Sequence, residues 1–382
     1  MDKLARSFVT PEAYEQLKER RLYSDRGWLL FVPLRGAVDL THKVKQEFEK
    51  LLSEHSEKYK NLEVSVDWGE DDKGTPTRMF PDGEIIVRLS QHVSGSDAYV
   101  FQCVHNKQIP FSVNDMLIEL LIAGRTLKVQ GARHITAVVP YLPYSRGDKP
   151  TYMKPECTTA RLMADMMANS GFDAVICYHP HTENLRGYYE PLIFIPINGL
   201  DLAISLFIAY KGNPEVVALS TDIGSGHITQ HFAEGLGIDY VVTHKIRRAD
   251  GSISSKGVLG DLEGKKKALI VEDESMSMST IKNCLKILSK YDITAELLVS
   301  HLKLSEDYIE KLSELHNSYN LEHLYTTDDV PLPEAVKDLP YVTVLSLAER
   351  LAFVINHMFY GVSISAPFWP RTEPPMFEPR PI

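Results

Sequence analysis

The chain has 382 residues, of which 44% are hydrophobic and 24% charged, a composition typical of a globular protein with room for two domains. Its formal net charge of −10 argues against broad nucleic-acid binding, which needs a basic surface to displace phosphate counterions. The first residues are charged throughout and predict no signal peptide, and the apolar run 28–34 is too short to cross a bilayer. We therefore expect a cytoplasmic protein that binds neither nucleic acid nor membrane.

In chain order, the hydrophobic pattern predicts two successive blocks of alternating strands and helices, preceded by a charged helical extension at 1–27. An apolar run at 28–32 is the first strand. The first block continues with strands at 84–89, 98–104, 134–139 and 173–178 and helices at 114–129 and 156–170. The second block has strands near 192–195, 215–219, 239–243, 266–271 and 293–299 and helices near 199–209, 226–235, 277–289 and 305–317.

Two such blocks of similar length predict an α/β protein with two doubly wound parallel-sheet domains. We place these domains at 28–190 and 191–345, with 346–382 as a closing segment. Six prolines in 366–382 exclude a helix or a central strand there. The four cysteines include no CxxC pair and are predicted to be reduced, mostly buried thiols.

Functional sites in such folds lie beyond the carboxyl ends of the strands. Glu272 and Asp273 close the apolar strand 266–271 and precede a loop of small residues and an amphipathic helix. There, acids can hold sugar hydroxyls, while loop amides and the helix dipole receive a phosphate. The alternative is that these residues only cap the helix.

Two other motifs follow strands of the second block. Asp222 lies among glycines after the strand 215–219, where it could meet a metal or a hydroxyl, or form a plain turn. Lys245 and Arg247 precede the Gly/Ser-rich stretch 249–260, where a basic cluster could close over a polyphosphate. The alternative for this cluster is a solvated loop.

The first block offers three weaker motifs. Arg146 and Asp148 lie on a Tyr- and Pro-stiffened loop that suits a nucleotide triphosphate, although it equally reads as a surface loop. His179 and His181 follow a strand and could ligate a metal or be structural. The third motif contains Phe80, Asp82 and Glu84. Taken by itself, this segment predicts a β-turn that leads into a strand.

The chain has no nucleophilic Ser or Cys arrangement and no GxxxxGK[ST] motif, so it is not a P-loop kinase. Phosphoryl transfer mainly needs positioning, cations and Mg²⁺. The order of the segments, over about 78–365, resembles the ribose-phosphate pyrophosphokinases, or PRPP synthetases. The segments are FPDGEIIVRL, VND at 113–115, PYLPYSRGDK, HPH with RGYY, STDIGSG, HKIRR and LIVEDESMSMST.

This resemblance implies two phosphoribosyltransferase-like domains, with ATP on the first and the ribose phosphate on the second, and a homo-oligomer built from dimers, up to a hexamer. It implies roles for the motif residues in three groups. The ATP-binding residues would be Phe80, Asp82 and Glu84 from a neighbouring subunit, with Arg146 and Asp148. The catalytic and Mg²⁺-binding residues would be Lys245, Arg247, His181 and Asp222. The ribose and phosphate residues would be Glu272, Asp273, Ser277, Ser279 and Thr280.

Three departures from the family pattern bear on function. Residues 276–280, Met-Ser-Met-Ser-Thr, stand where the family usually has Asp-Thr-Gly-Gly-Thr, and side chains in place of the glycines should obstruct a phosphate cradle. Gly147 stands in place of a usual Gln, and the acid before His181 is lost.

We therefore predict a pyrophosphokinase that moves the β,γ-diphosphoryl group of ATP onto the anomeric hydroxyl of a ribose, with Mg²⁺. The altered loop favours a 5-substituted acceptor such as ADP-ribose, as in phage relatives that make ADP-ribose pyrophosphate to rebuild NAD⁺. Two alternatives stay open. One is ordinary PRPP synthesis from ribose 5-phosphate. The other is a non-catalytic regulatory homologue, which retention of the catalytic and metal residues disfavours.

Overall fold

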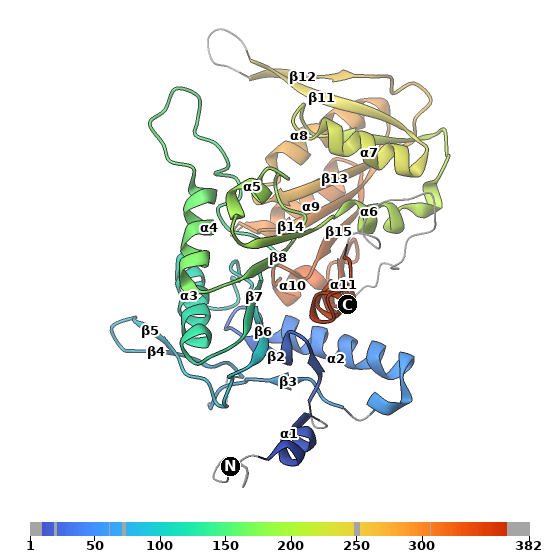
Figure 1. Ribbon diagram of the computed structural model, residues 1–382. Helices are drawn as coiled ribbons and strands as arrows, with labels where there is room; N and C mark the ends of the chain where they lie inside the picture. Colours follow the sequence, from blue (N-terminus) through green and yellow to red (C-terminus); the bar gives the residue numbers. More distant parts are fainter. Residues whose placement is uncertain are drawn as a thin grey trace. The chain divides into compact units, whose positions relative to one another are not determined.

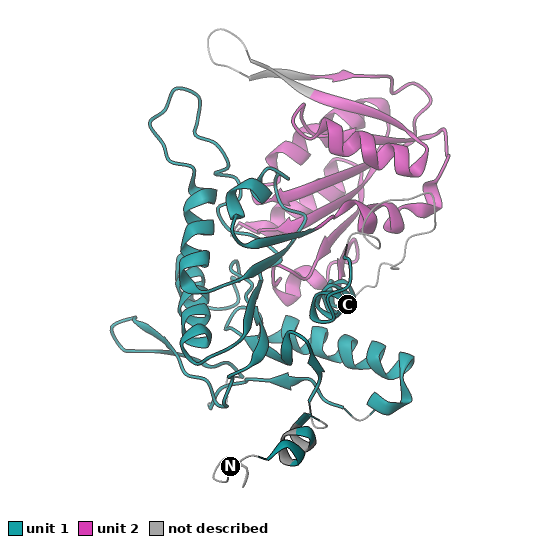
Figure 2. Cartoon of the chain, in the orientation of Figure 1, with its two compact units in different colours: residues 1–196, 347–364 teal, residues 197–346, 365–382 magenta. Residues whose placement is uncertain are grey.

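The computed structural model describes residues 10–18, 21–60, 62–70, 74–247, 253–305 and 307–364 (Figure 1). For residues 13, 14, 16, 17, 244–247 and 253–256 it describes the backbone alone. The chain forms two compact units (Figure 2). Unit 1 comprises the chain up to Pro196 together with 347–364, and unit 2 is built from 197–346. The predicted domain boundary at 190/191 lies six residues before this division.

Unit 1 is built on a sheet of seven strands among the described residues, in the order β1-β2-β6-β7-β8-β9, with β3 also paired to β2. Its strands β2, β6, β7 and β8 run parallel and are almost wholly buried, because helices cover both faces. The strands are β1 (Tyr23–Ser24), β2 (Gly27–Pro33), β3 (Ser65–Val66), β6 (Ser96–Phe101), β7 (His134–Val138), β8 (Ala174–Tyr178) and β9 (Ile193–Ile197).

Helices α2 and α11 pack together on one face of this sheet, and α3 and α4 pack together on the other (Figure 1). A two-stranded hairpin, β4 (Thr77–Met79) with β5 (Ile85–Val87), projects from the unit. The helices are α1 (Pro11–Lys18), α2 (Val38–His55), η2 (Glu57–Tyr59), α3 (Val113–Val129), α4 (Thr159–Ser170), α5 (Leu185–Tyr189) and α11 (Ala348–Phe359).

Unit 2 also contains seven strands in its described part, in the order β12-β11-β10-β13-β14-β15-β16. All neighbours are parallel except β11 and β12, which form an antiparallel pair. The strands are β10 (Val216–Ser220), β11 (Asp239–Arg247), β12 (Ile253–Leu259), β13 (Lys267–Ser275), β14 (Thr294–Leu302), β15 (Leu321–Thr327) and β16 (Val342–Leu345). The helices are α6 (Leu200–Leu206), η3 (Ile208–Tyr210), α7 (Gly226–Leu236), α8 (Ser279–Leu288), η4 (Ser289–Tyr291), α9 (Tyr308–Ser318) and α10 (Glu334–Lys337).

The predicted α/β architecture with two parallel sheets is confirmed. The amphipathic face expected for α8 is buried against β13 and β14, with Ile281, Cys284, Leu285 and Leu288 each at most 2% exposed. Cys103, Cys177 and Cys284 are buried free thiols and Cys157 is an exposed one, as predicted for reduced cysteines. Burial raises the pKa of the Cys177 thiol, which keeps it protonated and unreactive.

Three sequence expectations were wrong. The strand expected near 192–195 in the second block is β9, at the edge of the sheet in unit 1. The strand expected at 84–89 shortens to β5 and pairs with β4 rather than joining a sheet. Residues 21–27 are no extension, because Leu22 is 5% exposed and bonds Leu29 across β1 and β2. A local sequence pattern predicts that a segment forms a strand, whereas the strand with which it pairs depends on distant residues.

None of the helices in the described part of the chain combines the length and the apolarity that spanning a bilayer requires.

Candidate active site

The loop after β7 carries Arg146 and Asp148. Arg146 is exposed, whereas Asp148 is half-buried. The loop folds onto the first turn of α4, because the amide of Ala160 donates to the carbonyl of Gly147 at 3.2 Å. A Cβ at Gly147 would lie 1.8 Å from Thr159 Oγ1, so any side chain at this position would force Thr159 or the loop to move.

The loop after the neighbouring strand β8 carries the two histidines. His179 is 6% exposed and has a φ of 41°, which is uncommon for a residue other than glycine, whereas His181 is exposed. Tyr188 on α5 donates its hydroxyl to the carbonyl of Asp148 at 2.6 Å. This bond joins the loop after β7 to the segment that follows β8. The structure therefore brings two of the motifs together at one edge of the sheet.

The turn at 80–84 stands apart from these loops, at the tip of the projecting hairpin (Figure 1). Its shape comes from local bonds, since the amide of Phe80 donates to the carbonyl of Glu84 at 2.8 Å and Gly83 has a φ of 95°. Phe80 is 49% exposed, and Asp82 and Glu84 are exposed as well. The structure does not bring these three residues to Arg146 or His181 of the same chain.

The base of the hairpin is held by a buried carboxylate that sequence reasoning missed. Glu119 on α3 is 0% exposed and accepts bonds from Arg35 Nε at 2.9 Å and from Thr77 Oγ1 at 2.5 Å. Arg35 also lies over the ring of Phe111, at 3.7 Å from its centroid. The available signal was the position of Glu119 on the helix that begins with the VND segment at 113–115. The hairpin thus has a fixed base and an exposed tip.

In unit 2, the loop after β10 is ordered around Asp222. Its Oδ1 accepts the amide of Ser225 at 3.0 Å, and its carbonyl accepts the hydroxyl of Ser220 at 2.6 Å. Thr243 on β11 donates its hydroxyl to the carbonyl of Thr221 at 2.7 Å. Thr221 in turn donates its hydroxyl to the Glu272 carboxylate. These bonds tie the ends of β10, β11 and β13 together.

Lys245 and Arg247 lie near the end of β11, where only the backbone is described. Val242 on β11 pairs with Ser220, so Lys245 continues three residues beyond the end of β10. Its backbone is therefore at the same edge of the sheet as the Asp222 loop. The loop residues 248–252 that follow lie outside the described residues.

The strand β13 extends to Ser275, four residues beyond its predicted end, and includes all three acids. Glu272 and Glu274 share one side of the strand and Asp273 takes the other, because successive strand residues alternate. The amide of Glu274 bonds Asp273 Oδ1 at 2.7 Å. All three side chains are partly buried at the carboxyl edge.

The loop between β13 and α8 corrects one sequence expectation. Met278 was expected to obstruct a phosphate cradle, yet it is 4% exposed and packs into the core of unit 2. It can do so because it has a φ of 57° and turns its side chain beneath the loop. Ser277 and Ser279 are exposed, with hydroxyl oxygens 3.0 Å apart, Met276 is 53% exposed, and Thr280 is half-buried.

Metal binding would depend on few protein ligands. The described residues contain no group of three or more His, Cys, Asp or Glu side chains placed to hold an ion. Asp222 offers a carboxylate oxygen, the donor that Mg²⁺ prefers, and His181 offers an imidazole. Each of these two residues could by itself supply one ligand to an ion that takes most of its oxygens from phosphates and water.

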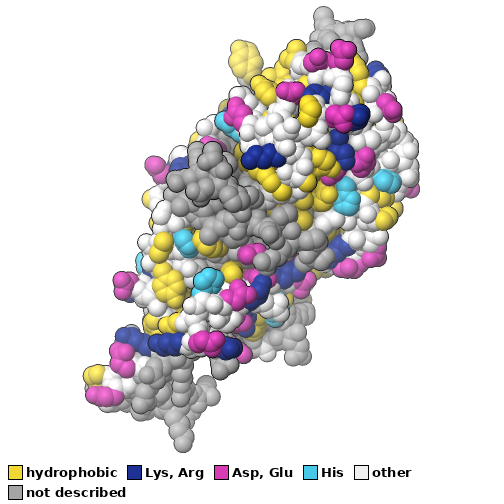
Figure 3. Space-filling model, turned by 90° about the vertical axis from the view of Figure 1, so that its right-hand side faces the viewer, with side chains coloured by type: hydrophobic (Ala, Val, Ile, Leu, Met, Phe, Trp, Pro, Cys, Tyr) yellow, Lys and Arg dark blue, Asp and Glu magenta, His cyan; other side chains and the backbone are white. Residues whose placement is uncertain are grey.

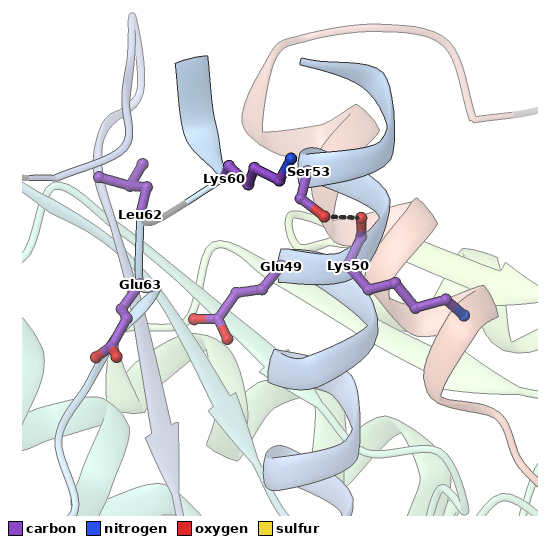
Figure 4. A pocket seen from close by; sticks show the side chains of 6 residues that line it. All are labelled: Glu49, Lys50, Ser53, Lys60, Leu62 and Glu63. Atoms are coloured by element: carbon purple, nitrogen blue, oxygen red, sulfur yellow. Dashed lines mark hydrogen bonds between the residues drawn. The ribbon is translucent and has the colours of Figure 1, made fainter. Parts of the chain in front are cut away.

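A surface groove in unit 1 is lined by none of the motif residues. It is formed by α2 and the segment after it (Figure 4). Its lining residues are Glu49, Lys50, Ser53, Lys60, Leu62 and Glu63. Acidic and basic side chains balance there, so the groove has no preference for an anion. On the face drawn in Figure 3, Lys and Arg are interspersed with Asp and Glu and form no continuous basic surface among the described residues.

Two parallel α/β sheets whose carboxyl edges carry acids, hydroxyls and a helix N-terminus define a phosphoribosyltransferase-like protein. Residues 38–171 match the family model for the N-terminal domain of ribose phosphate pyrophosphokinase. The chain is 30% identical to the ribose-phosphate pyrophosphokinase of Helicobacter hepaticus over 77% of this chain and 91% of that protein. It is also 30% identical to that of Synechococcus elongatus, over 84% and 93% of the two chains.

Among solved structures, the phosphoribosylpyrophosphate synthetase of Mycobacterium smegmatis matches with a TM-score of 0.72 and 27% identity, over 87% of this chain and 98% of that one. The chain belongs to the ribose-phosphate pyrophosphokinase family, and it is an enzyme of the ATP-dependent diphosphotransferase class.

Proposed function

We propose that the chain transfers the β,γ-diphosphoryl group of ATP to the anomeric hydroxyl of a ribose 5-phosphate moiety. The bonded edge of unit 2, where Thr221 joins the Asp222 loop to Glu272, supports this more than any other observation. The anomeric oxygen attacks the β-phosphorus in line, the bond from that phosphorus to the α,β-bridging oxygen breaks, and AMP leaves.

The residues of unit 1 bind the nucleotide in this proposal. Arg146 and Asp148 bind ATP, and His181 serves both the metal and catalysis. In unit 2, Lys245 and Arg247 stabilise the charge of the group in transfer. Glu272 and Asp273 hold ribose hydroxyls, and the loop and α8 receive the 5-phosphate through Ser277, Ser279 and Thr280.

Mg²⁺ is the proposed cofactor, held by Asp222 and His181 together with phosphate oxygens. Bound there, it neutralises charge on the β- and γ-phosphates. The fit is supported by the exposed carboxylate and imidazole of the two residues. Removing divalent ions with EDTA should abolish turnover, and adding Mg²⁺ back should restore it.

The enzyme is proposed to act as a homo-oligomer, a dimer or a hexamer. Support comes from the hairpin, because Phe80, Asp82 and Glu84 lie on an exposed tip away from the other ATP residues of their own chain. In this arrangement the three residues bind the adenine of ATP on a neighbouring copy.

For the acceptor, we propose a ribose whose 5-phosphate is substituted, such as ADP-ribose, which would give ADP-ribose pyrophosphate. The support is the chemistry of the loop at 276–280. It lacks the acid and both glycines of the usual family pattern, and it exposes Met276 at 53% beside two hydroxyls. A diphosphate diester carries less charge at that point than a free phosphate and needs less tight a cradle.

Ribose 5-phosphate is the second candidate acceptor, which would make the product PRPP. The burial of Met278 supports it, because this side chain packs into the core of unit 2 and not on the exposed side of the loop. The printed names of the relatives, ribose-phosphate pyrophosphokinases, also favour it.

One experiment separates the candidates. The protein is incubated with ATP and Mg²⁺, ribose 5-phosphate and ADP-ribose are offered separately, and AMP and the pyrophosphorylated sugar are measured. A kcat/KM at least about tenfold higher for one acceptor identifies it, since this corresponds to about 1.4 kcal/mol of discrimination. If the protein releases no AMP with either sugar, a non-catalytic regulatory homologue is favoured.

A further inference from the structure

The loop between β13 and α8 makes its sharp bend at a residue that is poorly suited to it. Met278 has φ 57° and ψ 6°, the left-handed region in which glycine is favoured because a side chain costs energy there. No side chain caps the N-terminus of α8, so the first turn of the helix depends on this bend. Some other interaction must stabilise the loop.

The first stabilising contact is the side chain of Met278 itself. It is 4% exposed and belongs to the core cluster that includes Ile281 of α8 and Leu302 and Leu304 beside the end of β14. The carbonyl of Met278 accepts the amide of Lys282 at 2.8 Å, which closes the first turn of the helix. Burial of the apolar side chain offsets the unfavourable backbone.

The second is an ion pair directly before the loop. Lys303 Nζ lies 2.6 Å from Glu274 Oε2, and the two side chains are only 7% and 6% exposed. The amide of Lys303 also donates to the carbonyl of Ser275 at 2.8 Å. Lys303 therefore holds the last two residues of β13 through both its backbone and its side chain. Removing one partner would leave a buried charge without its counter-ion.

We propose that Met278, Glu274 and Lys303 are positioning residues that fix the loop 276–280 in the conformation that receives the acceptor's phosphate. This inference rests on the proposed function. Met278 is buried and the ion pair of Glu274 and Lys303 is buried directly before the loop, whereas Ser277 and Ser279 are exposed on it. Their loss changes how well the acceptor binds and leaves ATP binding and the transfer step intact.

A purely stabilising role makes a different prediction. It would lower the melting temperature and leave the acceptor KM of the folded enzyme unchanged. A matched control is available in the same unit, because Lys282 on α8 pairs with Glu314 on α9, also at 2.6 Å. This control pair is partly exposed and joins α8 to α9, whereas the pair of Glu274 and Lys303 joins the end of β13 to the residue after β14.

The test compares Met278→Ala, Met278→Gly and Met278→Leu, and Lys303→Met with Lys303→Arg, against Lys282→Met. Two quantities are measured at a temperature where every variant is folded. The first is amide hydrogen exchange in peptides covering 275–283. The second is KM for the acceptor and for ATP, with kcat.

Met278→Ala and Lys303→Met should speed exchange at the loop and raise the acceptor KM by about tenfold or more, with ATP KM within about twofold of wild type. Both effects should be smaller in Met278→Gly than in Met278→Ala, because glycine tolerates the positive φ. Met278→Leu, Lys303→Arg and Lys282→Met should stay close to wild type. If Met278→Ala is too unstable, Lys303→Met carries the same test.

The outcomes separate the inference from the function on which it rests. Unchanged exchange in Met278→Ala and Lys303→Met overturns the inference, whatever the activity. Faster exchange with an unchanged acceptor KM would show that the phosphate does not bind at the loop. It would overturn the positioning role of the three residues. A wild-type protein that releases no AMP with either sugar defeats the proposed function and the acceptor role with it, while the exchange rates still decide whether the three residues hold the loop.

Discussion

The loop at 276–280 and the turn at 80–84 belong to the same proposed active site but are built in opposite ways. The loop is anchored from below by Met278, which is 4% exposed, and by a buried ion pair. The turn is shaped by its own backbone bonds and presents Phe80 at 49% exposure. In the proposed function, the loop that binds the acceptor is therefore anchored within one chain, whereas the turn that binds the adenine is exposed to a neighbouring copy.

The hairpin that carries this turn is nevertheless held firmly at its base. Glu119 is wholly buried and bonds both Arg35 and Thr77. A fixed base orients the tip, and an exposed tip can enter a neighbouring copy. If the proposed site is correct, the acceptor loop is ordered within one chain, whereas the adenine site is completed only when a second copy assembles with it.

The largest expected effect lies outside both regions, at Lys245. We expect Lys245→Ala to lower kcat by about 10³-fold or more, because the cation acts on charge that develops during transfer. Steady-state AMP release measures kcat, and thermal unfolding should match wild type. Lys211→Ala, at an exposed lysine of the same unit, is the control and should be unaffected. Near-normal turnover in Lys245→Ala would refute the role of this residue.

The next effect tests whether the turn serves another copy. Phe80→Ala should raise the ATP KM by about 10- to 100-fold, because stacking of a base on an aromatic ring contributes about 1–3 kcal/mol. The acceptor KM should stay unchanged. Kinetics with ATP varied at saturating acceptor provide the measurement.

Mixing variants sharpens this test. Phe80→Ala and Lys245→Ala preparations, combined and allowed to exchange subunits, should be more active at low ATP than the sum of the two, because mixed assemblies contain sites with both residues intact. The double variant mixed with Phe80→Ala cannot form such a site and is the control. Activity that merely adds would mean that the turn does not act across copies.

The sequence predicted the positions of the motifs well, because strand ends and turn chemistry are local. Asp222 does follow β10, and Glu272 and Asp273 do lie at the carboxyl edge of β13. It could not predict the direction of Met278, since one dihedral angle and a core contact decide it. Nor could it predict the pair of Glu274 with Lys303, whose partners are 29 residues apart, or that of Thr221 with Glu272, 51 apart.

The sheet assignment of β9 shows the same limit in the fold. Its apolar run predicted a strand, but the partner depends on Asp173, whose carbonyl accepts the amide of Ile193 at 2.9 Å. Glu119 was missed for a related reason. It lies on a helix whose apolar pattern predicts burial, but its bonds to Arg35 and Thr77 come from two other elements.

A smaller effect is expected at Gly147, where this chain has a glycine in place of a bulky side chain, the reverse of Met278. Gly147→Gln should destabilise the fold by about 1–3 kcal/mol, because its Cβ would lie 1.8 Å from Thr159 Oγ1 and force the loop to move. The melting temperature measures this loss. Adding Thr159→Ala removes the closest atom and should recover part of the lost melting temperature. If it recovers none, the contact with Thr159 is not the cause of the destabilisation.

The smallest expected effect is at the exposed hydroxyls of the acceptor loop. Ser277→Ala and Ser279→Ala should each raise the acceptor KM only about threefold to tenfold, because a single hydrogen bond to a charged group contributes about 1 kcal/mol when loop amides also bind it. Both hydroxyls are exposed and bond each other at 3.0 Å, so neither variant should lower the melting temperature. If the natural acceptor is a diester, each variant should raise the KM for ADP-ribose by this amount. The KM for ribose 5-phosphate should rise more, because its dianion relies more on these donors. If the variants raise the KM for ATP and leave that for the acceptor unchanged, the acceptor's phosphate does not bind at this loop. The buried contacts of the loop would then contribute to stability alone.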